Sequence, residues 1–283
     1  MLVTLLFSAW AIDSGYYRPL SLFTYITSLF FLVLLSEQFF PFKESWKGLG
    51  VEEIKDVVHS LLGTNLGTLL GSVFNTFIAA VIIGYSNILD GLNLWPNHLH
   101  ISVQVLLLIV LSDFGRYWQH RLHHRFKTLW LFHELHHSDK KLNVFKASRS
   151  HILERFLQQI CMYLPLVIIG VNQDALYYFL MINSVLGLFT HSNMDIRCGW
   201  FENILMTPRN HKIHHSIDMI EGNSNFGSFT VIWDRLFGTF IHSSSLGDFD
   251  SIEVGTAYLD GHETLYTQYF GPFIKAYKRF KTQ

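Results

Sequence analysis

The sequence has little charge and no strongly basic stretch. Asp, Glu, Lys and Arg make up 15% of the 283 residues, whereas soluble domains carry about 25%. The formal net charge is -1, and no run of Lys or Arg resembles a surface that follows phosphates, which argues against a nucleic-acid partner. Because hydrophobic residues reach 49% and the mean hydropathy is positive, the composition indicates a membrane protein.

Cysteines are also scarce, and no repeat or low-complexity segment is present. Cys161 and Cys198 form no CxxC pair, so we expect reduced residues of the core or bilayer and no disulfide framework. We predict a single domain over 1–283. It divides into N-terminal helices and spans in 1–112, a histidine-motif region in 113–240 and a tail in 241–283.

Uncharged apolar stretches predict the membrane spans. Leu20 to Ser36 and Ser60 to Leu89 carry no formal charge, and the second exceeds the length needed to cross about 30 Å of hydrocarbon. Ile101 to Ser112 leads directly into the histidines. The stretches 156–173 and 175–190 predict a helical hairpin, either two crossings or a pair that dips and returns. The sequence therefore predicts an all-α integral membrane protein with about four transmembrane helices.

Two further features concern the helices. Residues Met1 to Ile12 are apolar but too short to span, so we expect an interfacial or partial helix there. Gly63, Gly67 and Gly71 recur every four residues, which favours close packing against another span, although glycine is also simply tolerated in lipid.

The histidine-rich region is predicted to face the cytoplasm. Residues 116–155 are rich in Arg, Lys and His and contain no apolar run long enough to cross, and positive loops favour the cytoplasmic side. The hairpin that follows returns His191 to the same side. We therefore expect a cytoplasmic, histidine-bearing cap.

Nine of the 16 histidines form four groups. The groups are His120 and His124; His133, His136 and His137; His191 alone; and His211, His214 and His215. Two copies of HxxHH arise by chance in roughly one such sequence per thousand. On helices each set is expected to face one way and hold one metal region. The alternative is that these histidines have no function and simply lie in a polar interface at the membrane surface.

Nine imidazoles are too many for one ion. Imidazole ligands suit zinc, copper, nickel or iron, and two ions sharing them keep open positions, whereas structural zinc closes at four ligands. An open two-metal site at a membrane face points to lipid chemistry, and redox iron would let dioxygen attack a C–H bond. The spacing alone does not distinguish iron from zinc.

Two other functions fit parts of the pattern. HELHH satisfies HExxH, in which Glu134 would be the general base of a zinc metalloprotease, but this leaves most of the histidines without a role. A metal-binding transporter or sensor is the second alternative. Transport sites usually lie near the midplane, whereas these clusters follow the predicted helix ends.

The order HRLHH, HELHH, HSN, HKIHH, NFG and WDRLFGTF resembles the fatty acid hydroxylase and sterol desaturase superfamily of membrane di-iron oxygenases. The resemblance implies a bundle of about four membrane helices with a cytoplasmic di-metal centre. It also implies hydroxylation or desaturation of a sterol, fatty acyl or ether lipid with O2. Electrons would come from a separate cytochrome b5-like or ferredoxin-type donor, in a bacterial inner membrane or the endoplasmic reticulum.

By this resemblance the nine grouped histidines match the family's ligands to two Fe ions, for which zinc can substitute in purified protein. His123 lies off the face of its neighbours and is not expected to bind. Asp195 stands where some relatives have a tenth histidine, and a ligand role for it stays open. Outer positions that would orient ligands or bind headgroups are His151, Asp113, Arg149, Asn193, Asp195 and Asn225. Asp113 is equally suited to cap the end of the third span, and Asp234 with Arg235 suggests a local ion pair.

Overall fold

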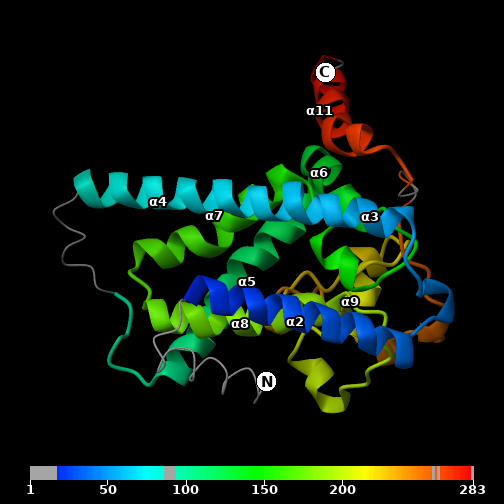
Figure 1. Ribbon diagram of the computed structural model, residues 1–283, viewed down its shortest axis with the longest axis horizontal. Coiled ribbons are helices and arrows are strands. Elements are labelled where there is room, and N and C mark those ends of the chain that lie inside the picture. Colours follow the sequence, from blue (N-terminus) through cyan, green and yellow to red (C-terminus); the bar gives the residue numbers. More distant parts are fainter. Residues whose placement is uncertain (1–17, 86–93, 257–258, 260–261, 282–283) are drawn as a thin grey trace.

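The computed structural model describes residues 18–85, 94–256, 259 and 262–281 (Figure 1). In these ranges the chain is helical, with isolated β-bridges and no strand, which confirms the all-α prediction. The prediction for Met1 to Ile12 lies outside the described residues. The helices that position the site are α2 (Arg18–Phe39), α3 (Val51–Val58), a π-helical segment (His59–Leu66), α4 (Gly67–Tyr85), α5 (Ile101–Arg125), α6 (Lys127–His137), α7 (Ile152–Ile168), α8 (Gln173–Thr190), α9 (Pro208–His214), α10 (Ile232–Leu236) and α11 (Leu265–Lys281).

Three of the described helical stretches are long and apolar enough to cross a membrane, namely Leu20–Phe39, Val51–Ile82 and Ile101–Arg125. The second joins α3, the π-helical segment and α4 into one continuous rod. The predicted hairpin is formed by α7 and α8, which are 17 and 18 residues long. These two do not join the three candidate spans, so the fourth crossing stays a prediction.

The glycine spacing serves close packing, as the sequence favoured. A Cβ at Gly67 would lie 2.7 Å from the carbonyl oxygen of Ile152 in α7, and a Cβ at Gly63 or Gly71 would overlap α7 or the turn before it. Small residues therefore let the backbones of α4 and α7 approach side by side. This contact holds the segment that leads into α7 in place. That segment in turn supports the histidine region.

The apolar core lies between α5, α7 and α8, where Leu108, Met162 and Phe179 are buried together. Burial of these side chains aligns α5 so that its C-terminal half continues past the core into the cap. The cap elements α6 and α9 gather toward the end of the bundle where α3 begins (Figure 1). Both cysteines are free, as expected, although Cys161 is exposed. The C-terminal region, expected as a tail, contains the helix α11.

Candidate metal centre

Four segments of the chain, α5, α6, the end of α8 and α9, bring the nine grouped histidines together. Two groups form, His120, His124, His133, His137 and His214 in the first, and His136, His191, His211 and His215 in the second. Within each group, one nitrogen of every ring lies within 4.8 Å of the others. His123 belongs to neither group, and its Nδ1 lies 2.7 Å from the carbonyl oxygen of Gln119 one turn earlier.

The two HxxHH motifs are each divided between the groups, which corrects the expectation that each set holds one metal region. In α6, His133 and His137 are one turn apart and share a face, while His136 points to the second group. In α9 the division is reversed, because His214 joins the first group and His211 the second. A motif on one helix thus contributes to both groups.

Burial keeps these imidazoles neutral. Outside the candidate spans, desolvation lowers the pKa of His191 and of His214 to about 3, and it places the pKa of His136 well below the ordinary value. Neighbouring histidines lower the pKa of His136 further, because positive charges in one pocket repel. Neutral imidazole is the form that binds metal ions.

Hydrogen bonds assign the proton of several rings to Nδ1. His136 lies 3.1 Å from the carbonyl oxygen of Arg149, and His191 lies 3.1 Å from that of Gly187, each through Nδ1. A carbonyl oxygen only accepts, so these rings donate from Nδ1, and a neutral ring then has only a lone pair on Nε2. His214 makes the same bond to Ser224 at 2.7 Å.

The unprotonated Nε2 atoms of neighbouring rings face each other. The Nε2 atoms of His136 and His191 are 3.1 Å apart, although both rings carry their proton on Nδ1. In the first group, the Nε2 atoms of His120 and His133 are 3.0 Å apart, while their Nδ1 atoms contact a carbonyl oxygen and a carboxylate. Two acceptors at this separation repel unless a cation lies between them. The donor sets therefore fit metal ions.

Unpartnered nitrogens point to the same conclusion. Over the described residues, Nε2 of His124, Nε2 of His214 and Nδ1 of His211 are buried without a hydrogen-bond partner. A buried polar atom without a partner costs about 1–3 kcal/mol. Coordination through Nε2 would remove that cost for His124 and His214, and Nδ1 of His214 already donates to a carbonyl oxygen. In His211 it is Nε2, not the unpartnered Nδ1, that faces His191.

The loop 224–230 orients the first group. Carbonyl oxygens of Ser224 and Phe226 accept from His214 and His120, and Asn225 between them has φ +52° in the left-handed region. The Asn225 side chain donates to the carbonyl of Asn210 and accepts from the backbone N–H of Ile241. Asn225 therefore acts on the loop rather than on a ligand ring.

Asp113 holds the next part of that loop. Its carboxylate accepts from the backbone N–H groups of Ser228, Phe229 and Thr230 and from the Thr230 hydroxyl. The alternative of a cap at the end of the span is wrong, since α5 continues to Arg125. Asp113 orients the loop that meets the histidines.

The predicted ion pair between Asp234 and Arg235 is also wrong. Asp234 accepts from the backbone N–H groups of Phe226 and Gly227, while Arg235 donates to Asn203. Burial raises the pKa of Asp234 to about 6. A buried loop with free N–H groups competes successfully for the carboxylate against an exposed guanidinium.

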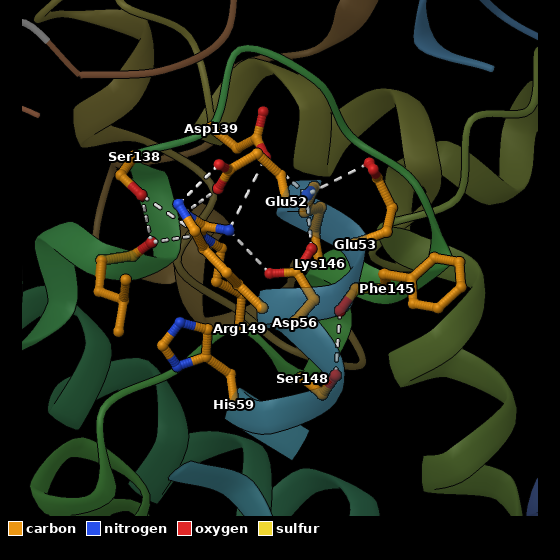
Figure 2. Close-up of polar contacts among 12 residues, drawn as sticks. Glu52, Glu53, Asp56, His59, Ser138, Asp139, Phe145, Lys146, Ser148 and Arg149 are labelled. Atoms are coloured by element: carbon orange, nitrogen blue, oxygen red, sulfur yellow. Dashed lines mark hydrogen bonds and ion pairs between the residues drawn. The ribbon is translucent and has the colours of Figure 1, made fainter. Parts of the chain in front are cut away.

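Arg149 contributes to the site through its backbone. Its carbonyl accepts from His136, whereas its guanidinium lies 2.8 Å from a carboxylate oxygen of Asp56. Figure 2 shows this guanidinium within a set of buried charges that we term the charged cluster. Its members are Glu52, Glu53, Asp56, Asp139, Lys146 and Arg149.

The other outer positions lie away from the grouped rings. His151 donates to the Tyr269 carbonyl and accepts from the Leu153 N–H, which caps α7. Asn193 bonds both backbone polar groups of Lys43.

Asp195 is 36% exposed and pairs with Arg209 at 3.0 Å, so it lies in a surface ion pair and in neither histidine group.

Two acidic residues, Glu154 and Glu134, differ in their relation to the histidine groups. Glu154 was missed from the sequence, yet its carboxylate lies 2.8 Å from Nδ1 of His133 and both side chains are buried. The only available signal was an acid in the first turn of the predicted hairpin's first helix. Glu134, the base of the protease alternative, lies in neither group, and one carboxylate oxygen is 4.0 Å from Nζ of Lys275. An HExxH base would have to face the metal.

Comparison with known proteins places these observations in a family context. Residues 105–239, which include all nine histidines, match the fatty acid hydroxylase family. The ornithine lipid hydroxylase OlsE of Rhizobium tropici is 34% identical over 215 residues, which cover 74% of this chain and 63% of that protein. The alkylglycerol monooxygenase of Homo sapiens is 32% identical, over 45% of this chain and 28% of that protein.

A lathosterol oxidase of Mus musculus is 28% identical over 57% of this chain and 53% of its own length. The chain thus spans less than two thirds of each of these relatives. No solved structure shows a significant match.

Proposed function

Since residues 105–239 of this chain belong to the fatty acid hydroxylase family, we propose that the protein is a membrane di-iron oxygenase that hydroxylates or desaturates a lipid with O2. The nine grouped histidines would hold the two iron ions, one ion in each group. The chain would act as one domain over 1–283. Its histidine groups would face the cytoplasm.

The observation that carries this proposal is the pair of facing lone pairs in each group. In both, neutral imidazoles direct Nε2 atoms at one another at about 3 Å while their Nδ1 atoms donate outward. The five nitrogen donors of the first group also exceed the closed four-ligand set of structural zinc.

The residues of the chain would prepare the site before metal or substrate arrives. Bound iron would supply the redox chemistry with dioxygen that no side chain provides. The Nδ1 hydrogen bonds from His120 and His214 hold their tautomers, so the lone pairs are available without a proton leaving first. Burial of both rings keeps bulk water away from the reacting atoms.

The substrate is proposed to be a membrane lipid. The relatives are named for an ornithine lipid, an alkylglycerol and lathosterol, and the first aligns over the largest share of this chain. We therefore place a polar acyl lipid ahead of an ether lipid or a sterol. A separate donor, cytochrome b5-like or of the ferredoxin type, would deliver the electrons.

Metal analysis and oxygen uptake on the detergent-purified protein test the proposal. With a reductant, a redox partner and lipid, the proposal expects about two irons per chain, one for each donor group, and lipid-dependent oxygen consumption. Parallel assays with ornithine lipid, alkylglycerol and sterol separate the substrates. Zinc alone, followed by no oxygen uptake after iron reconstitution, would contradict the assignment.

A further inference from the structure

The C-terminal helix α11 exposes large apolar side chains beside its basic ones. Phe270, Tyr277 and Phe280 are 53%, 60% and 82% exposed, whereas Gln268 is 3% exposed. A helix whose outer side faces only water carries polar rather than large apolar residues there. The outer face of α11 therefore suits an apolar surrounding.

The exposed apolar residues form a stripe with helical spacing. Its members are Tyr266, Phe270, Phe273, Ile274, Tyr277 and Phe280. At 100° per residue these positions fall within an arc of about 120°. An arc of this width is typical of a helix that rests on an apolar phase.

Basic residues accompany the stripe and acidic residues are absent from this helix. The segment Leu265–Lys281 contains Lys275, Lys278, Arg279 and Lys281 and no Asp or Glu. By the same helical spacing, Lys278 lies about 40° beyond one edge of the aromatic stripe, and Lys281 lies just inside that edge. Long basic side chains at this edge can reach anionic headgroups while their stems contact acyl chains.

The contacts of α11 place it at the level of a membrane surface. His59 is hydrogen bonded to Tyr269 and Gln268, each at 2.9 Å. His59 lies in the candidate span Val51–Ile82, three residues after Asp56, and no Asp, Glu, Lys or Arg follows in that span. Helix α11 thus meets the span where it changes from charged to uncharged sequence, which marks the headgroup region.

The direction of α11 agrees with this level. Figure 1 shows α11 running across the direction of α4, so it would lie along the membrane plane if α4 crosses the bilayer. We propose that α11 is an interfacial helix, with its aromatic stripe among the outer acyl segments and its lysines on anionic headgroups of the bilayer. This proposal does not depend on the oxygenase chemistry.

One edge of the stripe, at the half-exposed Phe273, faces α6 and connects this membrane contact to the histidine-bearing helix. Phe273 packs on Phe132 of α6 with ring centroids 5.1 Å apart, and Arg279 donates to the Lys127 carbonyl at 3.0 Å. Lipid bound by α11 would therefore hold α6 at a defined height above the bilayer.

Spin-label accessibility in reconstituted full-length protein tests the proposal. After Cys161 and Cys198 are replaced by Ser, single cysteines at Phe77, Asp250 and Tyr277 carry the label. Phe77, exposed on α4, is the lipid reference and Asp250 the water reference. In vesicles of phosphatidylcholine and phosphatidylglycerol, the label at 277 should lie about 5–10 Å below the phosphates, with high oxygen and low nickel-chelate collision rates.

The other outcomes overturn the proposal. Nickel-chelate accessibility at 277 equal to that at 250 would place the stripe in water. Protection from both oxygen and the chelate would mean that a protein, either a second copy or a partner, covers it. The double variant K278Q/K281Q tests what the two lysines contribute to membrane contact. The binding of α11 to anionic lipid should weaken by about fivefold for each lysine removed. A depth that is unchanged in this variant and in vesicles without phosphatidylglycerol would exclude a role for headgroup charge.

Discussion

The histidine groups and the charged cluster are neighbouring sets of buried polar side chains, but only the charged cluster is complete by itself. In the cluster, Lys146 pairs with Asp56 and Asp139, and Arg149 pairs with Asp56. Among the histidines, lone pairs face each other and three buried nitrogens lack a partner within the described chain. The charged cluster therefore satisfies its own members, whereas the histidine groups require a ligand.

The protonation states show the same contrast. Burial by itself lowers the pKa of Lys146 and Arg149, but the carboxylates of Asp56 and Asp139 raise both above their ordinary values. No such carboxylates surround His136, whose pKa stays well below its ordinary value because of burial and other histidines. Opposite charges thus make the cluster structural, whereas burial among other imidazoles leaves His136 as a neutral donor.

Removing a proposed ligand should have the largest effect on function. His214→Ala is expected to lower metal affinity and turnover by more than about a hundredfold, since loss of an outer partner alone costs 10–100-fold. The metal-free protein should lose about 1–3 kcal/mol of unfolding free energy, because the buried Ser224 carbonyl oxygen loses its donor, Nδ1 of His214. Iron content, oxygen uptake and thermal unfolding measure this.

The matched control is His123→Ala, which lies outside both groups and should retain metal. An unchanged iron content in the His214 variant would remove that residue from the ligand set.

The opposite pattern is expected for the charged cluster. Arg149→Ala leaves buried carboxylates without their partner and should lower the free energy of unfolding of the metal-free protein by about 3–5 kcal/mol. Denaturant unfolding measures it. Asp195→Asn, which removes the charge of the exposed partner in the pair with Arg209, should cost about 0–1 kcal/mol. Equal losses of unfolding free energy in the two variants would contradict the distinction between buried and surface ion pairs.

The glycine contact that supports both regions should be sensitive to one methyl group. Gly63→Ala would force the new Cβ into the backbone of Ser150, so we expect a loss of about 1–3 kcal/mol in unfolding free energy. Gly187→Ala in α8 meets nothing within 4 Å and should stabilise the helix by up to about 1 kcal/mol. Thermal unfolding of the two variants compares the crowded and open positions.

Glu154 places a negative charge beside the histidine groups, so its substitution tests whether charge also matters in that region. Glu154→Gln keeps an acceptor for His133 but removes the negative charge, and metal affinity should fall by about 10–100-fold. Competition with a chelator measures the affinity. Glu202→Gln, another buried acid that bonds Cys198 and Ser243, should leave metal affinity unchanged.

The smallest effect is expected at Glu134. Because its carboxylate lies outside both groups, Glu134→Gln should change turnover by no more than about twofold, which corresponds to a change of about 0.4 kcal/mol in the barrier. The steady-state rate with lipid measures this. Complete loss of turnover with full metal content would instead favour hydrolytic chemistry.

Several features were predictable because they depend on local spacing. The apolar stretches predicted the helices of the three candidate spans, and glycines four residues apart predicted their close packing. Histidines three and four apart predicted clusters, since residues at these separations share a helix face. Each of these inferences needs only the geometry of one helix.

Other features depend on how distant segments meet. The outer residues illustrate this, because Arg149 acts through its backbone and Asp113 through a loop more than 100 residues away. Glu154 has no distinguishing motif, and only the packing of α7 against α6 brings it to His133. Side-chain identity therefore predicted which groups are polar, but not which partner each would find.

By itself, the sequence determined an all-helical chain with nine histidines positioned for metal binding, because helical periodicity and hydrophobicity act over a few residues. The tertiary structure decided that each HxxHH motif is divided between two groups and that α11 turns its aromatic face outward. Both outcomes depend on the angles at which helices pack, which arise from contacts between segments far apart in the chain.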